Sequence, residues 1–369
     1  MGECLTRDGN FGNAASRSHV YGWRAEEAVE NARRQLADAL GADPREIVWT
    51  SGATESNNLA IKGFARANRS RGKHIVTSRI EHKSVLDTCK ALGEEGFEID
   101  YLDPDADGRV SCERLQEALR EDTILVSLMH LNNEVGAIND IRALARLCRQ
   151  QNVAFHCDAA QSVGKIACDV RDLDVDLLSV SAHKFYGPKG SGALYVRRAP
   201  GVVVEAQMHG GGHERNMRSG TLATHQIVGL GLAVELATAE RDDEYLRLQK
   251  LRSRFLEAVL ELPGVSVNGA IESSFPGIVN VCFEQIDSET LMIHLRDLAL
   301  SSGSACTSTD VEPSYVLRAM GLTPVQAQSS LRFSFGRYTR EDDIDFAVEK
   351  IRTSVQTLRG QRLASVSQS

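Results

Sequence analysis

Short apolar runs alternate with amphipathic segments of helical period from about Arg24 to about Arg198. In the first segment, apolar residues recur at helical spacing from Ala25 to Leu40, and the repeat stops at Gly41, a residue type that commonly follows the last turn of a helix. The apolar runs that follow are as short as strands. We therefore predict strands at 47–50, 74–78, 97–102, 123–129, 153–157, 177–181 and 193–196.

Segments long enough for helices lie between the first five of these strands, near 55–70, 83–95, 111–120 and 140–151. Parallel neighbours cannot be joined by tight turns, so strands that alternate with helices are typical of a mostly parallel sheet covered on both faces. We therefore expect a large three-layer α/β domain over residues 10–240, with residues 1–9 as a shortened N-terminus.

The pattern changes after a long helical region at about 225–262. Short apolar runs at 265–268, 278–283 and 331–334 predict strands, a helix is expected near 288–299, and a last helix begins at about Arg340. This last helix has acidic residues at its start and basic residues further along, which the helix dipole favours. We expect a smaller α+β domain over residues 241–369.

Composition narrows the class of protein. The 369 residues are enough for two domains, and 42% hydrophobic with 25% charged residues is ordinary for a globular chain. The net charge of −8, without a run of five Lys or Arg, argues against direct binding of nucleic acid. Because the chain has no signal-peptide core and no apolar stretch of about 18 residues, we expect a cytosolic protein without membrane contact.

The eight cysteines are spread along the chain without a C-x-x-C pair, so neither an intrinsic metal site nor a disulfide framework is indicated. Cys306 differs from the others because it lies in a run of small polar residues, 301–309, between predicted helices. An accessible thiol in such a segment can act as a thiolate nucleophile. A loop cysteine with no task is the plainer interpretation.

Three segments of the first domain carry candidate chemistry. Residues 51–57 follow a strand and open a helix, where small residues and unpaired amides can bind a phosphate, although a Ser or Thr cap followed by Glu is also ordinary helix punctuation. Asp158 follows the strand at 153–157, at the edge where α/β sheets bind ligands. Its carboxylate can pair with a protonated pyridine nitrogen or can simply cap the next turn.

The third segment, 179–190, contains Lys184 at the end of the next predicted strand, before the turn at Gly187-Pro188. A lone lysine is ordinarily a solvated surface residue. Lys184 lies 26 positions after Asp158 (184 − 158), however, so both side chains can project from one edge of the sheet. A lysine that is desolvated there can form an imine with a carbonyl cofactor.

Together these segments resemble the cysteine desulfurases of the fold-type I pyridoxal phosphate enzymes, in particular the IscS-like group of the class V aminotransferase family. The resemblance runs from about Gly9 to about Arg359, and the segment 301–308 separates this group from most other pyridoxal enzymes. The other matching segments are Ser51–Ser56, Glu81–His82, Asn132–Glu134, Asp158–Gln161, Ser181–Lys184 and Arg218–Thr221.

The resemblance implies that pyridoxal 5'-phosphate is bound covalently by Lys184, with Asp158 beside the pyridine nitrogen. His82 would stack on the ring and take part in proton transfer; a helix cap ahead of Lys83 is its alternative role. Further contacts to the cofactor are implied for Ala53, Thr54, Ser181 and His183 at the phosphate, for Thr221 from the second subunit of a homodimer, and for Asn133 and Gln161 on the side of the ring oxygen.

The implied activity is that of a cysteine desulfurase. L-cysteine would be bound by Asn133 and by Arg332, the latter through the carboxylate, unless Arg332 is only a surface or ion-pairing residue. L-alanine would be released, and Cys306 would keep the sulfur as a persulfide. Cys306 is also a candidate transient ligand of an iron–sulfur cluster. The sulfur would then pass to an iron–sulfur scaffold protein and to carriers for tRNA thiolation.

Two departures from the family pattern bear on this interpretation. Family members extend further before the segment that matches Met1, and residues 361–369 do not resemble the family's scaffold-docking tail, which weakens the prediction of a scaffold partner. The alternatives are a selenocysteine lyase or another β-eliminating pyridoxal enzyme, or an inactive truncated paralogue that binds a complete desulfurase.

Overall fold

The computed structural model describes residues 1–301 and 313–366. The chain divides into two compact units. The first unit comprises residues 1–102, 110–130 and 139–241, and the second comprises 103–109, 131–138 and the chain from 242 onward. The long helix α7 (Thr224–Val259) begins in the first unit and ends in the second.

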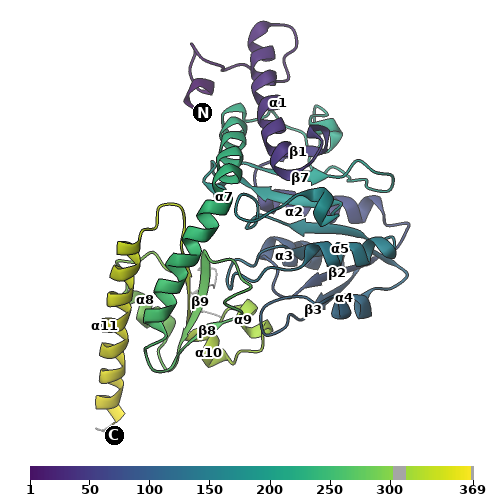
Figure 1. The fold of residues 1–369 in the computed structure, drawn as a ribbon. Helices are drawn as coiled ribbons and strands as arrows, with labels where there is room; N and C mark the ends of the chain where they lie inside the picture. The colour runs from purple at the N-terminus through teal and green to yellow at the C-terminus, as the bar shows by residue number, and fades with distance from the viewer. Residues whose placement is uncertain (302–312, 367–369) are drawn as a thin grey trace. The chain divides into compact units, whose positions relative to one another are not determined.

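A seven-stranded sheet forms the centre of the first unit (Figure 1). Its order is β1-β7-β6-β5-β4-β2-β3. The five strands from β3 to β6 are parallel, and β7 is antiparallel to both β6 and β1. The strands are β1 (Ile47–Thr50), β2 (His74–Ser78), β3 (Glu98–Leu102), β4 (Thr123–Met129), β5 (Ala154–Asp158), β6 (Leu177–Ser181) and β7 (Gly192–Val196).

Helices cover both faces of this sheet, because successive strand residues point to opposite sides. In β1, Val48 packs in the cluster with α2 (Ala53–Ala67) and α3 (Lys83–Glu94), whereas Ile47 and Trp49 pack in the cluster on the other face. That other cluster includes residues of α1 (Val20–Leu40), α4 (Cys112–Ala118), α5 (Ile141–Gln150), α6 (Val170–Leu173) and the start of α7. The expected three-layer α/β architecture is confirmed.

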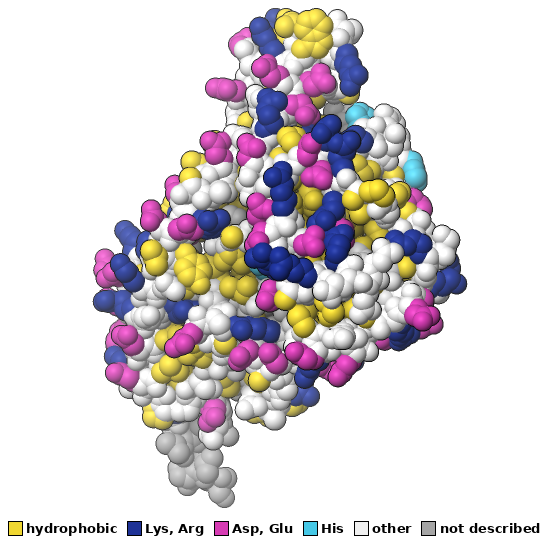
Figure 2. Space-filling view, turned by 45° about the vertical axis from the view of Figure 1, so that its right-hand side comes forward, with side chains coloured by type: hydrophobic (Ala, Val, Ile, Leu, Met, Phe, Trp, Pro, Cys, Tyr) yellow, Lys and Arg dark blue, Asp and Glu magenta, His cyan; other side chains and the backbone are white. Residues whose placement is uncertain are grey.

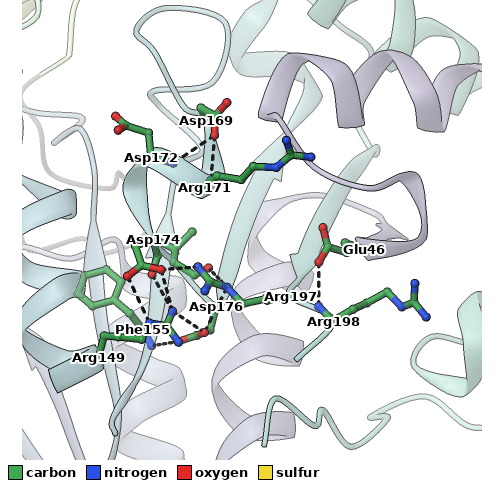
Figure 3. A network of polar contacts seen from close by, with 11 residues as sticks. Glu46, Arg149, Phe155, Asp169, Arg171, Asp172, Asp174, Asp176, Arg197 and Arg198 are labelled. Carbon is green, nitrogen blue, oxygen red and sulfur yellow. Dashed lines mark hydrogen bonds and ion pairs between the residues drawn. The ribbon is translucent and has the colours of Figure 1, made fainter. Parts of the chain in front are cut away.

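A network of ion pairs and hydrogen bonds lies at the end of the sheet where the parallel strands begin (Figure 3). Asp176, directly before β6, accepts from the Phe155 amide of β5 at 2.9 Å and from Arg149 Nη2 at 3.0 Å. Arg197, after β7, pairs with Asp174 at 2.8 Å and lies 3.5 Å from Asp176. The network therefore joins the end of α5 to three strands.

The second unit is built on an antiparallel sheet of three strands in the order β10-β9-β8. The strands are β8 (Val265–Asn268), β9 (Ile278–Phe283) and β10 (Ser330–Ser334), and the helices are α8 (Ser288–His294), α9 (Tyr315–Ala319), α10 (Pro324–Gln328) and α11 (Glu341–Val366). Phe255 of α7 packs on Phe333 of β10, with ring centroids 4.8 Å apart.

Most predicted elements agree with the structure to within a few residues. The helix expected at 288–299 was too long, because α8 ends at His294 and the chain turns at Leu295. The short helices α6, α9 and α10 were not predicted, since four or five residues hold too little periodic pattern to be recognised.

Candidate active site

The carboxyl ends of the parallel strands bring three predicted residues to one edge of the first unit. β5 ends at Asp158, and β6 ends at Ser181 and runs into the turn Ala182–Phe185, which carries Lys184. The loop after β2 carries His82 to the start of α3. Neighbouring parallel strands end on the same edge of a sheet, so the order of the strands places these loops together.

The start of α2 lacks the side-chain cap that its sequence allowed. Its N-cap residue is Gly52, at φ 150°, and no side chain caps the helix. Ser51 lies one residue before the N-cap position and does not cap the helix. Its backbone amide donates to Glu55 Oε2 at 2.8 Å. Helix capping by a Ser or Thr side chain therefore does not explain residues 51–54. The first backbone amides of α2 are available to an anion.

Two glycines make room beside that helix start. Gly192 of β7 lies between Thr50 and Ser181 in the register, and a Cβ at Gly192 would be 2.5 Å from Gly52 Cα. Only a glycine lets the two backbones approach so closely. A Cβ at Gly52 would meet, among the described residues, only Ser181 Oγ within 4 Å, at 3.8 Å. The space beside Gly52 is thus open and lined by a hydroxyl.

His183 lies next to this space. Its Nδ1 is 3.1 Å from Ser181 Oγ. Partial burial lowers the pKa of His183 below its ordinary value, and the positive charges of Lys184, Lys189 and Lys165 lower it further. The imidazole is therefore neutral near pH 7 and can donate one hydrogen bond. Lys184 itself is half-buried.

Asp158 is buried, and both of its carboxylate oxygens accept hydrogen bonds. Oδ1 accepts from the Ala160 amide at 3.0 Å, and Oδ2 accepts from Asn57 Nδ2 of α2 at 2.8 Å. The first bond is the turn cap that the sequence allowed. The second was not foreseen. Gln161, on the same turn, is half-buried and accepts from Lys165 Nζ at 2.8 Å.

His82 is exposed and is also the N-cap of α3, the alternative that the sequence left open. Its Nδ1 accepts from the Ser84 amide at 3.1 Å and lies 2.8 Å from Ser84 Oγ. The cap uses one ring nitrogen only. Nε2, on the other side of the ring, is not part of it, so capping and proton transfer are compatible.

Glu81, next to His82, is a fully buried carboxyl. Its Oε1 accepts from Ser78 Oγ at 2.7 Å and from the Met129 amide at 2.9 Å, which ties the loop of His82 to β2 and β4. Burial raises the pKa of Glu81 to about 8, and the negative charge of Asp158 adds to this, although the two hydrogen bonds oppose it.

Asn133 and Arg332 belong to the second unit. Arg332 of β10 donates from Nη1 to the Asn133 carbonyl oxygen at 2.9 Å. This bond joins β10 to the segment 131–138. Glu134 accepts from Ser314 Oγ at 2.5 Å. Burial raises the pKa of Glu134 to about 7, against the opposing effects of the Ser314 bond and the Arg332 charge.

Cys306 and Thr221 are the remaining predicted residues of the site. Cys306 lies outside the described residues. Thr221 is exposed. It lies three residues after Arg218, whose Nε donates to Glu55 Oε1 of α2 at 2.8 Å. The structure holds one chain, so the contact of Thr221 with a second subunit stays a prediction.

Comparisons with known proteins decide the family. Residues 7–346 match the aminotransferase class-V family model. Over 359 residues, which are 97% of this chain and 89% of the relative, the chain is 58% identical to the cysteine desulfurase IscS of Vibrio atlanticus (strain LGP32). It is 59% identical, with the same coverage, to the cysteine desulfurase IscS of Pseudomonas aeruginosa (strain LESB58). The chain belongs to the cysteine desulfurase family.

Solved structures agree with membership of the cysteine desulfurase family. A NifS-like protein that is 37% identical has a TM-score of 0.88, with 96% of this chain and 93% of that chain covered. DndA from Streptomyces lividans is 46% identical at a TM-score of 0.77, with 88% and 92% covered. The predicted family and the fold class are therefore confirmed.

Sequence reasoning gave no role to Asn57 and Ser84 in this desulfurase. One signal was available, because Asn57 lies three and four positions after Thr54 and Ala53 and so shares their face of the helix. Nothing local indicated that this face meets Asp158, which is 101 residues away.

Proposed function

We propose that this chain removes the sulfur of L-cysteine with the help of pyridoxal 5'-phosphate on Lys184, giving L-alanine and a persulfide on Cys306. One observation carries the proposal: Lys184, Asp158, His82 and an open, uncapped helix start lie on one edge of the sheet, in a chain 58% identical to a cysteine desulfurase. Each group has a partner in the chemistry of that cofactor.

The residues fit the cofactor part by part. The uncapped amides of Ala53 and Thr54 and the open space beside Gly52 suit a phosphate, with donors from Ser181 and His183 at its rim. The buried carboxylate of Asp158 suits a protonated ring nitrogen. Lys184, half-buried in the turn after β6, is proposed to supply the amine, and Gln161 is proposed for the ring oxygen.

Pyridoxal phosphate, when bound, supplies an electron sink for the negative charge that develops at the substrate Cα. Lys184 would hold the cofactor through its amine, and the same amine would serve as the base for the substrate Cα proton. His82 presents Nε2 for further proton transfer, because Nδ1 is held in the cap of α3. Asn133 and Arg332 are proposed to bind the substrate, Arg332 through its guanidinium and the carboxylate.

Cys306 is proposed to take the sulfur. Its thiolate attacks the sulfur of the bound cysteine, so that a sulfur–sulfur bond forms while the carbon–sulfur bond breaks. The electron pair of the broken bond stays with the carbon skeleton, which takes up protons and leaves as L-alanine. The sulfur remains on the enzyme as a persulfide, at the oxidation level of a disulfide, and no outside oxidant is needed.

A homodimer is proposed on the evidence of the exposed apolar surface. Hydrophobic side chains gather at the top of the face in Figure 2, over the start of α1. Phe11 before α1 and Tyr21 and Trp23 in the first turn of α1 expose 69%, 62% and 55% of their surface. Leu232 and Leu236, one turn apart on α7, expose 52% and 44%. Exposed apolar side chains of this kind are typical of an interface. As the family resemblance implies, we propose that Thr221 contacts the cofactor of the second copy.

The sulfur acceptors and the compartment follow from the family. We propose an iron–sulfur scaffold protein and tRNA-thiolation carriers as acceptors, and work in the cytosol. The seven cysteines within the described residues are free, which suits a reducing compartment. Within the same residues, no helix is both long and apolar enough to cross a membrane.

Incubation of the purified protein with L-cysteine tests the proposal, with assays for alanine and for protein-bound sulfane sulfur. Both should appear, and both should be lost in Cys306→Ala but kept in Cys112→Ala, which removes a half-buried thiol elsewhere. Undiminished alanine release by Cys306→Ala would instead indicate a lyase. A protein that stays colourless after reconstitution with pyridoxal phosphate would indicate an inactive paralogue.

A further inference from the structure

A buried amide joins two of the proposed active-site residues. Asn57, in the second turn of α2, has no exposed surface. Its Nδ2 lies 2.9 Å from Ser84 Oγ and 2.8 Å from Asp158 Oδ2. Ser84 Oγ in turn lies 2.8 Å from His82 Nδ1. A continuous chain of hydrogen bonds thus runs from His82 through Ser84 and Asn57 to Asp158.

The direction of each bond in this chain follows from chemistry. A carboxylate only accepts, so the Asn57 group that faces Asp158 must be the amide NH₂, and its second hydrogen points to Ser84 Oγ. The Ser84 hydroxyl, which accepts there, can give its own proton to His82 Nδ1. The Ser84 backbone amide also donates to Nδ1, at 3.1 Å. Nδ1 is therefore an acceptor, and the neutral imidazole carries its proton on Nε2.

We propose that Asn57 is a positioning residue, which with Ser84 fixes the carboxylate of Asp158 and the Nε2–H tautomer of His82 as one unit. This inference deepens the proposed function and rests on it. The Ala160 amide holds the other oxygen of Asp158, so both carboxylate oxygens are fixed by hydrogen bonds. His82 presents the protonated nitrogen away from the cap of α3.

A purely structural role explains Asn57 less well. A buried polar group is costly unless it is hydrogen-bonded, and an apolar residue would hold α2 in its layer without that cost. The Oδ1 atom of Asn57 is buried and has no hydrogen-bond partner among the described residues. Only the donor side of the amide is used, and both of its acceptors lead to residues of the site.

The test uses the purified holoprotein and the variants Asn57→Ala and Asn57→Asp. Asn57→Asp keeps the size of the side chain but replaces the donor with an acceptor, so it carries the test even if Asn57→Ala folds poorly. Asn68→Ala is the matched control: Asn68 is buried at the far end of α2, where its amide donates to the Phe64 carbonyl at 2.9 Å.

Both Asn57 variants should lower kcat by about 10- to 100-fold, the range for losing one hydrogen bond to a charged group, with little change in KM for cysteine. The visible absorption band of the bound cofactor should also change, because Asp158 no longer holds its orientation. Asn68→Ala should lower the melting temperature and leave kcat and the band unchanged. Asn57 variants with the kcat and the band of the wild type would overturn the inference.

Nitrogen NMR of histidine-labelled wild type reads the tautomer of His82 without substrate. The expected signal is that of Nε2–H, and a dominant Nδ1–H signal would contradict the hydrogen-bond chain. Ser84→Ala should lower kcat, and Ser84→Thr, which keeps the hydroxyl, should restore it. If the wild type makes no alanine, the proposed function fails. If the wild type is active and the Asn57 variants keep its kcat and absorption band, only this inference is overturned.

Discussion

Buried carboxylates at the two ends of the parallel strands have different hydrogen-bond partners. Directly before β6, Asp176 accepts from Arg149 and from the Phe155 amide and forms a longer ion pair with Arg197, at 3.5 Å (Figure 3). At the end of β5, Asp158 accepts from two neutral donors, the Ala160 amide and the Asn57 side chain. Both carboxylates are almost fully buried, with 2% and 5% of their surface exposed.

This difference distinguishes a structural charge from a functional one. The negative charge of Asp176 is balanced by arginines of the fold itself. Its contacts join β5, β6, β7 and α5. Neutral donors hold the orientation of Asp158 without cancelling its charge, which remains available to a cationic ring nitrogen. Substitutions at the Asp176 end should therefore mainly change stability. Substitutions at the Asp158 end should mainly change activity.

Lys184→Ala should have the largest effect on activity. The variant would lose both the proposed covalent attachment of the cofactor and the proposed base for the Cα proton, so alanine formation should fall by about 1,000-fold or more. The melting temperature should change little, because Lys184 is half-buried and lies in a turn. Alanine release from L-cysteine measures the effect. Full turnover in this variant would end the proposed mechanism.

Asp176→Ala should have the largest effect on stability. It leaves the Arg149 and Arg197 guanidiniums without their buried partner and the Phe155 amide without an acceptor, so we expect a loss of about 3 kcal/mol of unfolding free energy. Urea denaturation measures it. Asp158→Ala is the counterpart at the other end, and it should lower alanine formation far more than stability. A reversed outcome would refute the division between the two ends.

Glu81→Gln should stabilise the protein in a pH-dependent way. The folded-state pKa of Glu81 is raised to about 8 from 4.5, so the wild type loses stability as pH rises from about 4.5 to about 8, because folding must keep the carboxyl protonated. The glutamine stays neutral throughout. Its advantage should be absent near pH 4 and on the order of 3 kcal/mol at pH 7.

Urea denaturation at several pH values measures the effect of Glu81→Gln. Glu94→Gln, an exposed change near the end of α3, is its control and should leave the difference between pH 4 and pH 7 as in the wild type. A stability difference for Glu81→Gln that does not vary with pH would show that the carboxyl is ionised in the folded protein.

Arg142→Ala should have the smallest effect. Arg142 pairs with Asp172 at 3.0 Å, but the two side chains are 49% and 58% exposed, so water screens the pair. We expect a loss of at most about 1 kcal/mol in urea denaturation. A loss as large as that of Asp176→Ala would mean that burial does not separate the effects of the two ion pairs on stability.

The sequence by itself determined the strands, most helices and the family. Apolar runs and helical spacing are local properties, so β1, β2, β4, β6, β8 and β9 were predicted with their observed bounds. Lys184 and Asp158 were predicted as site residues because each lies at the end of a predicted strand, and the ends of parallel strands share an edge of the sheet. The helical repeat was predicted to stop at Gly41, and Gly41 is the residue that caps the end of α1, at φ 64°.

Only the tertiary structure decided which distant side chains meet. The pairing of Asn57 with Asp158, and of Arg149 with Asp176, depends on how a helix packs on the sheet, and no local pattern carries that information. The segments 103–109 and 131–138 likewise belong to the second unit through contacts remote in the chain. Hydrophobic periodicity states which face of an element is buried, but packing selects the partner of each buried polar group.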